Sequence, residues 1–303
     1  MKAIENIYSY YFPEVRRVID EVTKDFPHDV FLKAISPGLD NFHVPVIEKY
    51  IKFVSRDLPG LENFEHMYVT AGSSEGIFHI LVHLKMKDPK TRIYVFKGDY
   101  SGYKKYAEYL GMEVFEVENW KNLEKGVWFI TNPSTINGNI VPNSLILDVC
   151  NTGHKVIVDC SYFGLTRPHH FEIRHPNIIA VLSSFSKSFG MFYYRIGFTF
   201  SREKIASLET NIWFKNILSL IILDRIFSEF DQDYFYRKYR LLQEKIINKM
   251  NKELSLNIKP SDVLLVGYMD RERDIESIEK FKREKYYRFC LTPYFMEEEI
   301  IRQ

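Results

Sequence analysis

The stretch "SSFSKSFGMFYYRIG", residues 183–197, places one lysine and one arginine among serines, aromatic residues and glycines. It overlaps the end of the apolar run "IIAVLSS", a pattern typical of a buried strand. Because the stretch holds no acidic residue, neither Lys187 nor Arg195 has an ion-pair partner nearby in the sequence. A lysine at the end of a buried strand can form a Schiff base, and an arginine beside it can bind a phosphate with its planar guanidinium.

Two simpler interpretations of Lys187 stay open. The side chain could be a solvated lysine beside a loop, which is the commoner case for such a residue taken alone. The letters "SFSK" also fit the S-x-x-K motif of penicillin-binding enzymes, although that motif normally opens a helix. No SDN or KTG triplet accompanies it in this chain, which counts against the second interpretation.

The chain around this stretch alternates β-rich runs with helical patterns from about residue 67 to 200. Runs such as "VWFITNP" and "KVIVDCS" are apolar on both faces, which is typical of a mainly parallel sheet sandwiched by helices. A long helical pattern then leads to the strand patterns "SDVLLVGYMD" and "YYRFCLTPYF". The sequence therefore predicts an α/β fold with a large domain at 36–215 and a smaller α+β domain formed by 1–35 and 216–303.

Composition narrows the possible partners and the compartment. The 303 residues are 46% hydrophobic and carry a net charge of +1, and no basic block suggests a nucleic-acid surface. The longest apolar run, residues 216–223, is too short to span a bilayer. Glu5 interrupts the N-terminal segment where a signal peptide would need a continuous apolar core. The three cysteines, Cys150, Cys160 and Cys290, have no CxxC spacing, so we expect neither disulfides nor a metal site. A reducing cytoplasm is the predicted location.

Two further segments place polar side chains at predicted strand ends, where α/β folds bind ligands. In "TAGSSEG", residues 70–76, Ser73 and Ser74 open a predicted helix and suit a phosphate, although a serine there could simply cap the helix. No Walker lysine follows, which argues against a nucleotide triphosphate. In "VIVDCSYFG", residues 156–164, Asp159 could hold a protonated ring nitrogen or a metal, or cap a turn, and Tyr162 could donate to an oxygen.

In order and spacing these stretches resemble the class I/II aminotransferases, the fold-type-I enzymes that use pyridoxal 5'-phosphate (PLP). The opening stretch is similar to the family's S-x-S-K-x-x-G-x-x-x-x-R-x-G signature, with the eight-residue interval from Lys187 to Arg195 preserved. "TAGSSEG" resembles the phosphate-cup turn, "GDYSGY" the P-x-Y-x-x-Y loop, "DCSY" the D-x-x-Y motif and "YYRFCLT" the R-[IV]-x-[LF] strand. In compactness the chain is similar to the histidinol-phosphate aminotransferase and threonine-phosphate decarboxylase branch.

The resemblance implies a role for each motif residue. Lys187 would form the Schiff base with PLP and move the proton at the substrate's Cα. Asp159 would keep the pyridine nitrogen protonated, and Tyr162 would donate to the phenolic oxygen. The other implied contacts are Tyr100 stacked on the ring, the phosphate ligands Ser73, Ser74, Ser184, Ser186 and Arg195, and the substrate-binding residues Arg288 and Gly38.

Three departures from the family pattern qualify these roles. The N-P-x-N-P-x-G loop reads "NPSTING", residues 132–138, so Thr135 stands where an asparagine usually contacts the cofactor. Thr135 could donate there, or Asn137 could reach in. The tyrosine that usually crosses from a partner subunit is not identifiable in "SPGLDNFHVP", residues 36–45, and the chain is short after "SDVLLVGYMD".

The predicted function is a PLP-dependent aminotransferase that moves an amino group between an amino acid, or a related amine, and a 2-oxo acid. The alternative is a PLP-dependent lyase, decarboxylase or cyclase on the same fold, because reaction type depends on how the substrate is oriented. A catalytically silent binding protein is a third possibility, which the presence of Lys187 and Asp159 disfavours. Small-molecule substrates are the expected partners, without nucleic acid or membrane, and the resemblance implies a homodimer.

Overall fold

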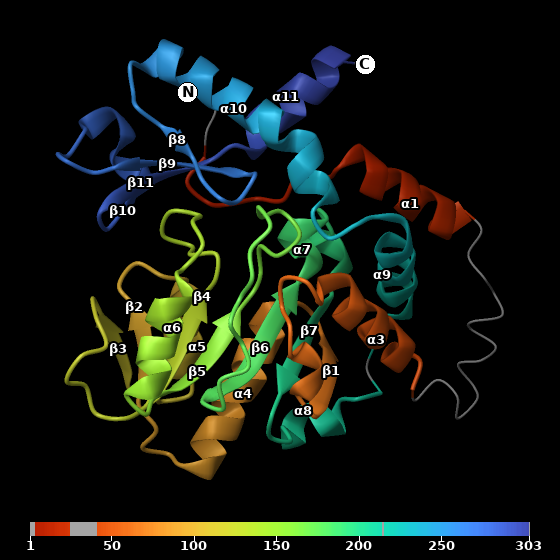
Figure 1. The fold of residues 1–303 in the computed structure, drawn as a ribbon, viewed down its shortest axis with the longest axis vertical. Coiled ribbons are helices and arrows are strands. Elements are labelled where there is room, and N and C mark those ends of the chain that lie inside the picture. Colours follow the sequence, from red (N-terminus) through yellow and green to blue (C-terminus); the bar gives the residue numbers. More distant parts are fainter. Residues whose placement is uncertain (1–3, 25–40, 214, 303) are drawn as a thin grey trace.

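A seven-stranded sheet forms the centre of the computed structural model, which describes residues 4–24, 41–213 and 215–302. The strand order is β1-β7-β6-β5-β4-β2-β3 (Figure 1). Neighbours from β6 to β3 are parallel, and β7 is antiparallel to both β1 and β6. The mainly parallel α/β sheet predicted from the sequence is therefore confirmed. The strands are β1 (His66–Thr70), β2 (Ile93–Phe96), β3 (Val114–Val117), β4 (Val127–Thr131), β5 (Lys155–Asp159), β6 (Ile178–Ser184) and β7 (Gly197–Ser201).

Helices cover both faces of this sheet because its inner strands are apolar on both sides. One apolar cluster joins one sheet face to α4 (Ser73–Lys87), α5 (Ser101–Tyr109) and α8 (Ala206–Thr210). A larger cluster joins the other face to α1 (Pro13–Lys24), α3 (His43–Val54), α6 (Asn143–Asn151) and α9 (Ile217–Glu229).

A second, four-stranded antiparallel sheet has the order β10-β11-β9-β8. Figure 1 shows it together with α10 and α11 above the end of the large sheet at which β6 leads into α7. Its elements are β8 (Lys259–Pro260), β9 (Val266–Asp270), β10 (Lys282–Arg283), β11 (Tyr286–Cys290), α10 (Tyr234–Leu254) and α11 (Thr292–Arg302). The N-terminal segment joins this sheet through a bridge between Ile4 and Cys290.

The two sheets fall on either side of residue 216, where the sequence predicts the change of domain. Helix α9 nevertheless packs against helices of the large domain, since the ring of Phe227 lies 5.4 Å from that of Tyr50 in α3 and 5.6 Å from that of Phe185 in α7. The boundaries 36–215 and 216–303 stay a prediction.

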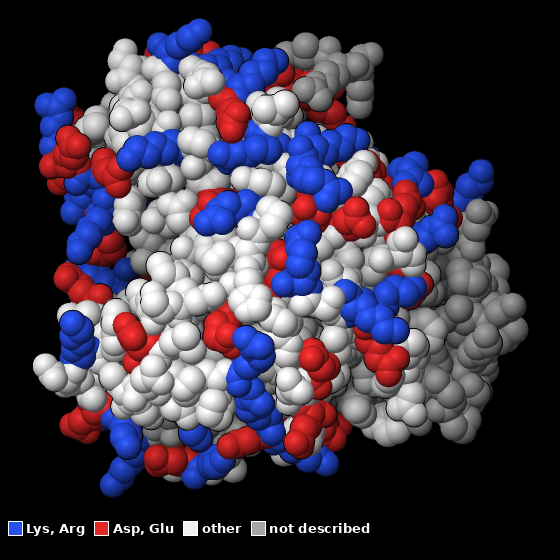
Figure 2. All heavy atoms as spheres, in the orientation of Figure 1, with Lys and Arg blue, Asp and Glu red and all other residues white. Residues whose placement is uncertain are grey.

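The surface seen in Figure 2 carries charged side chains of both signs. Figure 2 shows lysine and arginine side chains interspersed with aspartate and glutamate over the visible face. Among the described helices, none combines the length and the apolar character needed to cross a membrane. The three cysteines are buried and free.

The short helix α7 (Phe185–Ser188) sets the direction of the lysine. Phe185 and Phe189 are four residues apart, so they lie on one side of the turn, and their rings stack 5.6 Å apart in the core. Lys187 lies midway between them in the sequence and therefore projects from the opposite side, into a cleft. In "FSKSF" the two buried phenylalanines flank three polar residues, and this spacing thus determines where the ammonium group of Lys187 lies.

Gly197 begins β7 at the point where β6 and the turn between β1 and α4 come closest. A Cβ atom on Gly197 would lie 2.3 Å from the carbonyl oxygen of Ser183 and 2.8 Å from Cα of Gly72. Both neighbours are backbone atoms, so they cannot move aside as a flexible side chain would. The close approach of these three segments therefore requires glycine.

We expect Gly197→Ala to lower the free energy of unfolding by about 2 kcal/mol, because two backbone segments must separate. Urea denaturation of purified protein measures this loss. Gly267→Ala is the matched control, since its new methyl group would meet a side-chain methyl of Ile258 at 3.0 Å. A loss in Gly197→Ala no larger than in Gly267→Ala would contradict the argument.

Candidate active site

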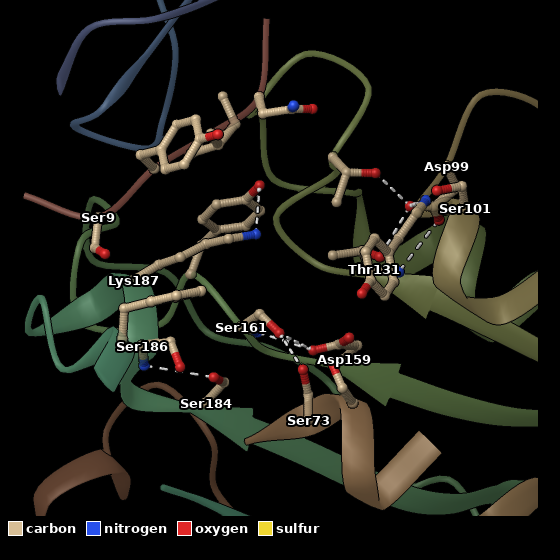
Figure 3. Close-up of a pocket in the computed structure, with 18 of the residues that line it drawn as sticks. Ser9, Ser73, Asp99, Ser101, Thr131, Asp159, Ser161, Ser184, Ser186 and Lys187 are labelled. Carbon is tan, nitrogen blue, oxygen red and sulfur yellow. Dashed lines mark hydrogen bonds between the residues drawn. The ribbon is translucent and has the colours of Figure 1, made fainter. Parts of the chain in front are cut away.

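A cleft of about 560 Å³ lies where the large sheet, the small sheet and the N-terminal segment meet. This volume is within the usual range for a small-molecule site. Residues from both sheets line it, including Asp159 from β5, Lys187 from α7 and Arg288 from β11. Those of the sequence-predicted site residues that the structure describes thus converge on one cavity, as Figure 3 shows for several of them.

Lys187 extends into this cleft (Figure 3). Its Nζ donates a hydrogen bond of 3.3 Å to the hydroxyl of Tyr162 and lies 4.5 Å from the centre of that ring. Tyr162 itself is almost fully buried, so its ring is a fixed contact for the Lys187 amine. None of the described ion pairs involves Lys187, which leaves its amine free for a ligand.

Asp159 ends β5 and is 2% exposed. Its Oδ1 accepts a 3.0 Å hydrogen bond from the Ser161 backbone N–H and another from the Ser161 hydroxyl, so the predicted turn cap is present. Its Oδ2 accepts a 2.9 Å hydrogen bond from the Tyr103 hydroxyl. Burial raises the pKa of this carboxyl, and the bonds from Ser161 and Tyr103 partly oppose that rise. A nearby cation would stabilise the ionised form.

Arg195 and the hydroxyls of Ser184 and Ser186 lie at one end of the cleft. Arg195 donates to the Ser186 hydroxyl at 3.3 Å and to the carbonyl of Ala71 at 2.8 Å. The Ser184 hydroxyl accepts from the backbone N–H of Ser186, which caps α7. None of the described hydrogen bonds of Arg195 reaches a carboxylate, so its positive charge is not neutralised by an ion pair.

The first turn of α4 completes this end. Ser73 and Ser74 open the helix and line the cleft, as predicted, but Gly72 is the N-cap residue and no side chain caps the helix. The serine cap that the sequence allowed is therefore wrong. The Ser73 hydroxyl instead lies 2.9 Å from that of Ser161. The backbone N–H groups of a helix start, two hydroxyls and a guanidinium are suitable ligands for a phosphate.

Thr135 and Tyr100 lie at the opposite side of the cleft and both contact Asp99. The Thr135 hydroxyl donates to Asp99 Oδ1 at 2.5 Å, and the Tyr100 backbone N–H donates to the same oxygen at 2.7 Å. Asn137 does not line the cleft, and its Oδ1 accepts from the backbone N–H of Asn139. The threonine hydroxyl is thus engaged by a carboxylate, and the Asn137 side chain is bonded to its own loop; which of the two contacts the cofactor stays a prediction.

Arg288 lies on β11 and is 8% exposed. Its guanidinium donates to the carbonyl oxygens of Thr135 and Glu5, while its Nε has no partner among the described residues. Burial lowers the pKa of this group. A buried cation bonded only to carbonyls favours an added carboxylate. Gly38, the other predicted substrate-binding residue, lies outside the described residues.

Several cleft residues were not predicted from the sequence. Asp99, Thr131 and Ser161 line the cleft near Asp159, and residues 5–9 form part of its wall. Tyr103 lies behind this lining, fully buried, and bonds Asp159 and Thr131. Asp99 follows the end of β2 as Asp159 ends β5, and this position was the available sequence signal. Within the described residues, no group of three or more histidine, cysteine or acidic side chains is arranged to hold a metal.

The family model for aminotransferase class I and II matches residues 41–230. This is more than half of the sequence, and the chain belongs to the class I and II aminotransferase family, as its motifs predicted. The histidinol-phosphate aminotransferase of Thermotoga sp. (strain RQ2) is 27% identical over 203 residues, which are 64% of this chain and 56% of that protein. The match thus spans little more than half of the relative.

The fold is also found in solved structures of other proteins, including the following two. An aminotransferase from Staphylococcus aureus has a TM-score of 0.71 at 14% identity, covering 100% of this chain and 93% of that one. Histidinol-phosphate aminotransferase from Sinorhizobium meliloti, in complex with PLP, has a TM-score of 0.67 at 13% identity, covering 95% and 85%. The predicted fold type is therefore confirmed, and it is the fold of a PLP-dependent family.

The raised pKa of Asp159 has a consequence for stability. The folded protein keeps a proton on this carboxyl over a pH range in which the unfolded chain has released it. As pH rises above about 4, the folded state therefore loses about 1.4 kcal/mol for each pH unit of that range. Stability that is fully present below the ordinary pKa is lost as pH rises through the folded-state value.

We expect Asp159→Asn to reduce this fall in the free energy of unfolding between pH 4 and pH 7, measured by urea denaturation without PLP. Asp148→Asn removes an exposed carboxyl on α6 and should leave the wild-type fall unchanged. If Asp159→Asn lost as much stability over this range as the wild type does, the assigned burial effect would be wrong.

Proposed function

We propose that this chain is a PLP-dependent aminotransferase that transfers an amino group between an amino acid, or a related amine, and a 2-oxo acid. The observation that carries the proposal is the placement of Lys187, which is in none of the ion pairs among the described residues, in the same cleft as the buried carboxyl of Asp159. Family membership supports the same conclusion. Because the curated relative is only partly covered, its activity is a guide and not a finding for this chain.

The residues of the cleft fit PLP at both ends of the cofactor. Ser73, Ser74, Ser184, Ser186 and Arg195 would bind the phosphate, since this end of the cleft is cationic and rich in hydroxyls. Asp159 would hold the protonated pyridine nitrogen, which would neutralise a carboxyl whose pKa burial raises. Tyr162 would donate to the phenolic oxygen and Tyr100 would stack on the ring.

When bound, PLP supplies an electron sink for the bonds at the substrate's Cα. Lys187 would hold the cofactor through Nζ, and the same amine would serve as the base and acid that moves the proton at the substrate's Cα. The Tyr162 hydroxyl, 3.3 Å from Nζ, would keep the Lys187 amine positioned beside the substrate's Cα. Arg288 would bind the substrate carboxylate through two parallel hydrogen bonds.

The Thr135–Asp99 contact also keeps the second candidate function open. A hydroxyl donated to Asp99 at 2.5 Å is not available to a cofactor oxygen without rearrangement. Because the orientation of the substrate decides which Cα bond breaks, a changed contact on this side could favour a lyase, decarboxylase or cyclase.

We further infer a homodimer in the cytoplasm. Phe192, 48% exposed, lines the cleft and Tyr193, 91% exposed, follows it, which supports coverage of this rim by a second copy. The three free cysteines support a reducing compartment. Light scattering should then give twice the chain mass, and no nucleic acid or membrane is proposed as a partner.

We expect Lys187→Ala to abolish covalent attachment of PLP, because Nζ is the amine proposed to bond it. Reduction of the PLP-loaded protein with borohydride, followed by peptide mass spectrometry, should place the label on Lys187 in the wild type and nowhere in the variant. Lys104→Ala is the matched control, since this lysine pairs with Glu116 at 2.6 Å. A label on another lysine in the wild type would contradict the assignment.

The reaction is tested by a panel of amino acids, amines such as histidinol phosphate, and 2-oxo acids. An aminotransferase should convert bound PLP to pyridoxamine 5'-phosphate with at least one donor, followed by recovery with a 2-oxo acid. Mass spectrometry identifies the products. Release of carbon dioxide, or of ammonia with a 2-oxo acid and no pyridoxamine 5'-phosphate, would favour the lyase alternative and contradict transamination.

A further inference from the structure

Two acidic side chains in the cleft are connected by a chain of hydroxyl groups. Asp99 Oδ1 lies 2.9 Å from the Thr131 hydroxyl, which lies 2.7 Å from the Tyr103 hydroxyl. The Tyr103 hydroxyl in turn lies 2.9 Å from Asp159 Oδ2. Figure 3 shows Asp99 beside Thr131, away from the Asp159 and Ser161 pair. All three distances are in the range of O–H···O hydrogen bonds.

These three contacts need more protons than the two hydroxyls hold. Each hydrogen bond requires one hydrogen between its oxygens, and Thr131 and Tyr103 supply one each. If both carboxyls were ionised, one short O···O contact would have no hydrogen and would be repulsive. A single additional proton, carried by Asp99 or Asp159, completes the chain in either direction.

The surroundings favour this extra proton. Tyr103 is 0% exposed and Thr131 and Asp159 are each 2% exposed, so water does not replace a missing hydrogen bond between them. Asp99, at the other end, is partly buried in the cleft wall. Burial raises the pKa of both carboxyls, and burial also keeps the proton on Tyr103. The charge of Asp99 further raises the pKa of Asp159, and Lys187 lowers it.

Asp99 and Asp159, the two ends of this chain of hydroxyl groups, differ in their other neighbours. Asp99 also accepts from Thr135 and from the Tyr100 backbone, whereas Asp159 also accepts from Ser161 and lies next to the thiol of Cys160. Lys187 is the cation that acts on Asp159. A second cation at the Asp159 end would draw the negative charge there and leave the proton on Asp99.

We propose that Asp99 and Asp159 share one proton through Thr131 and Tyr103, so that the pair carries a single negative charge, and that Asp99 is a positioning residue that fixes this charge on Asp159. In the transfer, the proton of Asp159 passes to Tyr103, that of Tyr103 to Thr131, and that of Thr131 to Asp99. No proton enters or leaves. The second part of this proposal rests on the proposed function, because it takes the pyridine nitrogen as the cation.

The first part is tested on the apo protein by infrared difference spectroscopy with ¹³C-labelled aspartate. The wild type should show the C=O stretch of one protonated aspartate per chain at pH 7, shifted by the label. Asp99→Asn should lose this band, because its amide replaces the protonated carboxyl as donor to Thr131. Asp148→Asn, at an exposed position, should keep it.

Thr131→Val keeps both carboxyls but interrupts the chain. We expect the pH at which the band disappears to fall by about one unit or more. Thr199→Val is the matched control, because the buried Thr199 hydroxyl has no hydrogen-bond partner among the described residues, and it should leave this pH unchanged. Circular dichroism checks that each variant is folded.

Absence of the band in the wild type at pH 7 would overturn the shared proton. If the band disappeared at the same pH in Thr131→Val as in the wild type, the proton route through Thr131 would be overturned. In the PLP-loaded wild type the C=O band should persist. Asp99→Asn mimics protonated Asp99, so this variant should still bind PLP with an affinity within about threefold of that of the wild type. The apo spectra involve no cofactor and test only the shared proton. The labelling experiment at Lys187 tests the proposed function, so a negative result in one experiment does not imply a negative result in the other.

Discussion

The position of Lys187 depends on the burial of the aromatic rings on either side of it. Phe185 and Phe189 lie in the core, and their stacking leaves the lysine between them only one direction, into the cleft. The same core includes Tyr50, whose hydroxyl is 2.7 Å from that of Ser183 at the end of β6. The strand, the short helix and the amine are therefore held as one unit, and the rest of the site is arranged around it.

Around that amine the protein keeps charges that its own side chains do not neutralise. Arg288 is buried against carbonyl oxygens, Arg195 bonds to a hydroxyl and a carbonyl, and Asp159 is buried with a raised pKa. Burial of Arg288 and Asp159 destabilises the folded chain, whereas Arg195 is exposed. A ligand with a cationic ring nitrogen and a carboxylate would offset these two costs, and its phosphate would pair with Arg195, as the proposed PLP and amino-acid substrate would do.

Much of this site could be predicted from the sequence because its residues lie in short motifs at strand ends. The roles implied for Lys187 and Asp159 depend on local spacing, which a sequence displays directly. Asp99 could not be assigned in the same way, since its importance arises from contacts with Thr131 and Thr135, more than thirty residues away. The antiparallel direction of β7 likewise follows from tertiary pairing, which strand patterns do not encode.

In the proposed function, the cleft holds PLP between the serine-rich end with Arg195 and Asp159. A crystal structure of the PLP-loaded protein is the decisive experiment. We expect the pyridine nitrogen about 3 Å from a carboxylate oxygen of Asp159, with the phosphate against Ser186 and Arg195. A ring nitrogen directed away from Asp159, or a phosphate bound outside this cluster, would contradict it.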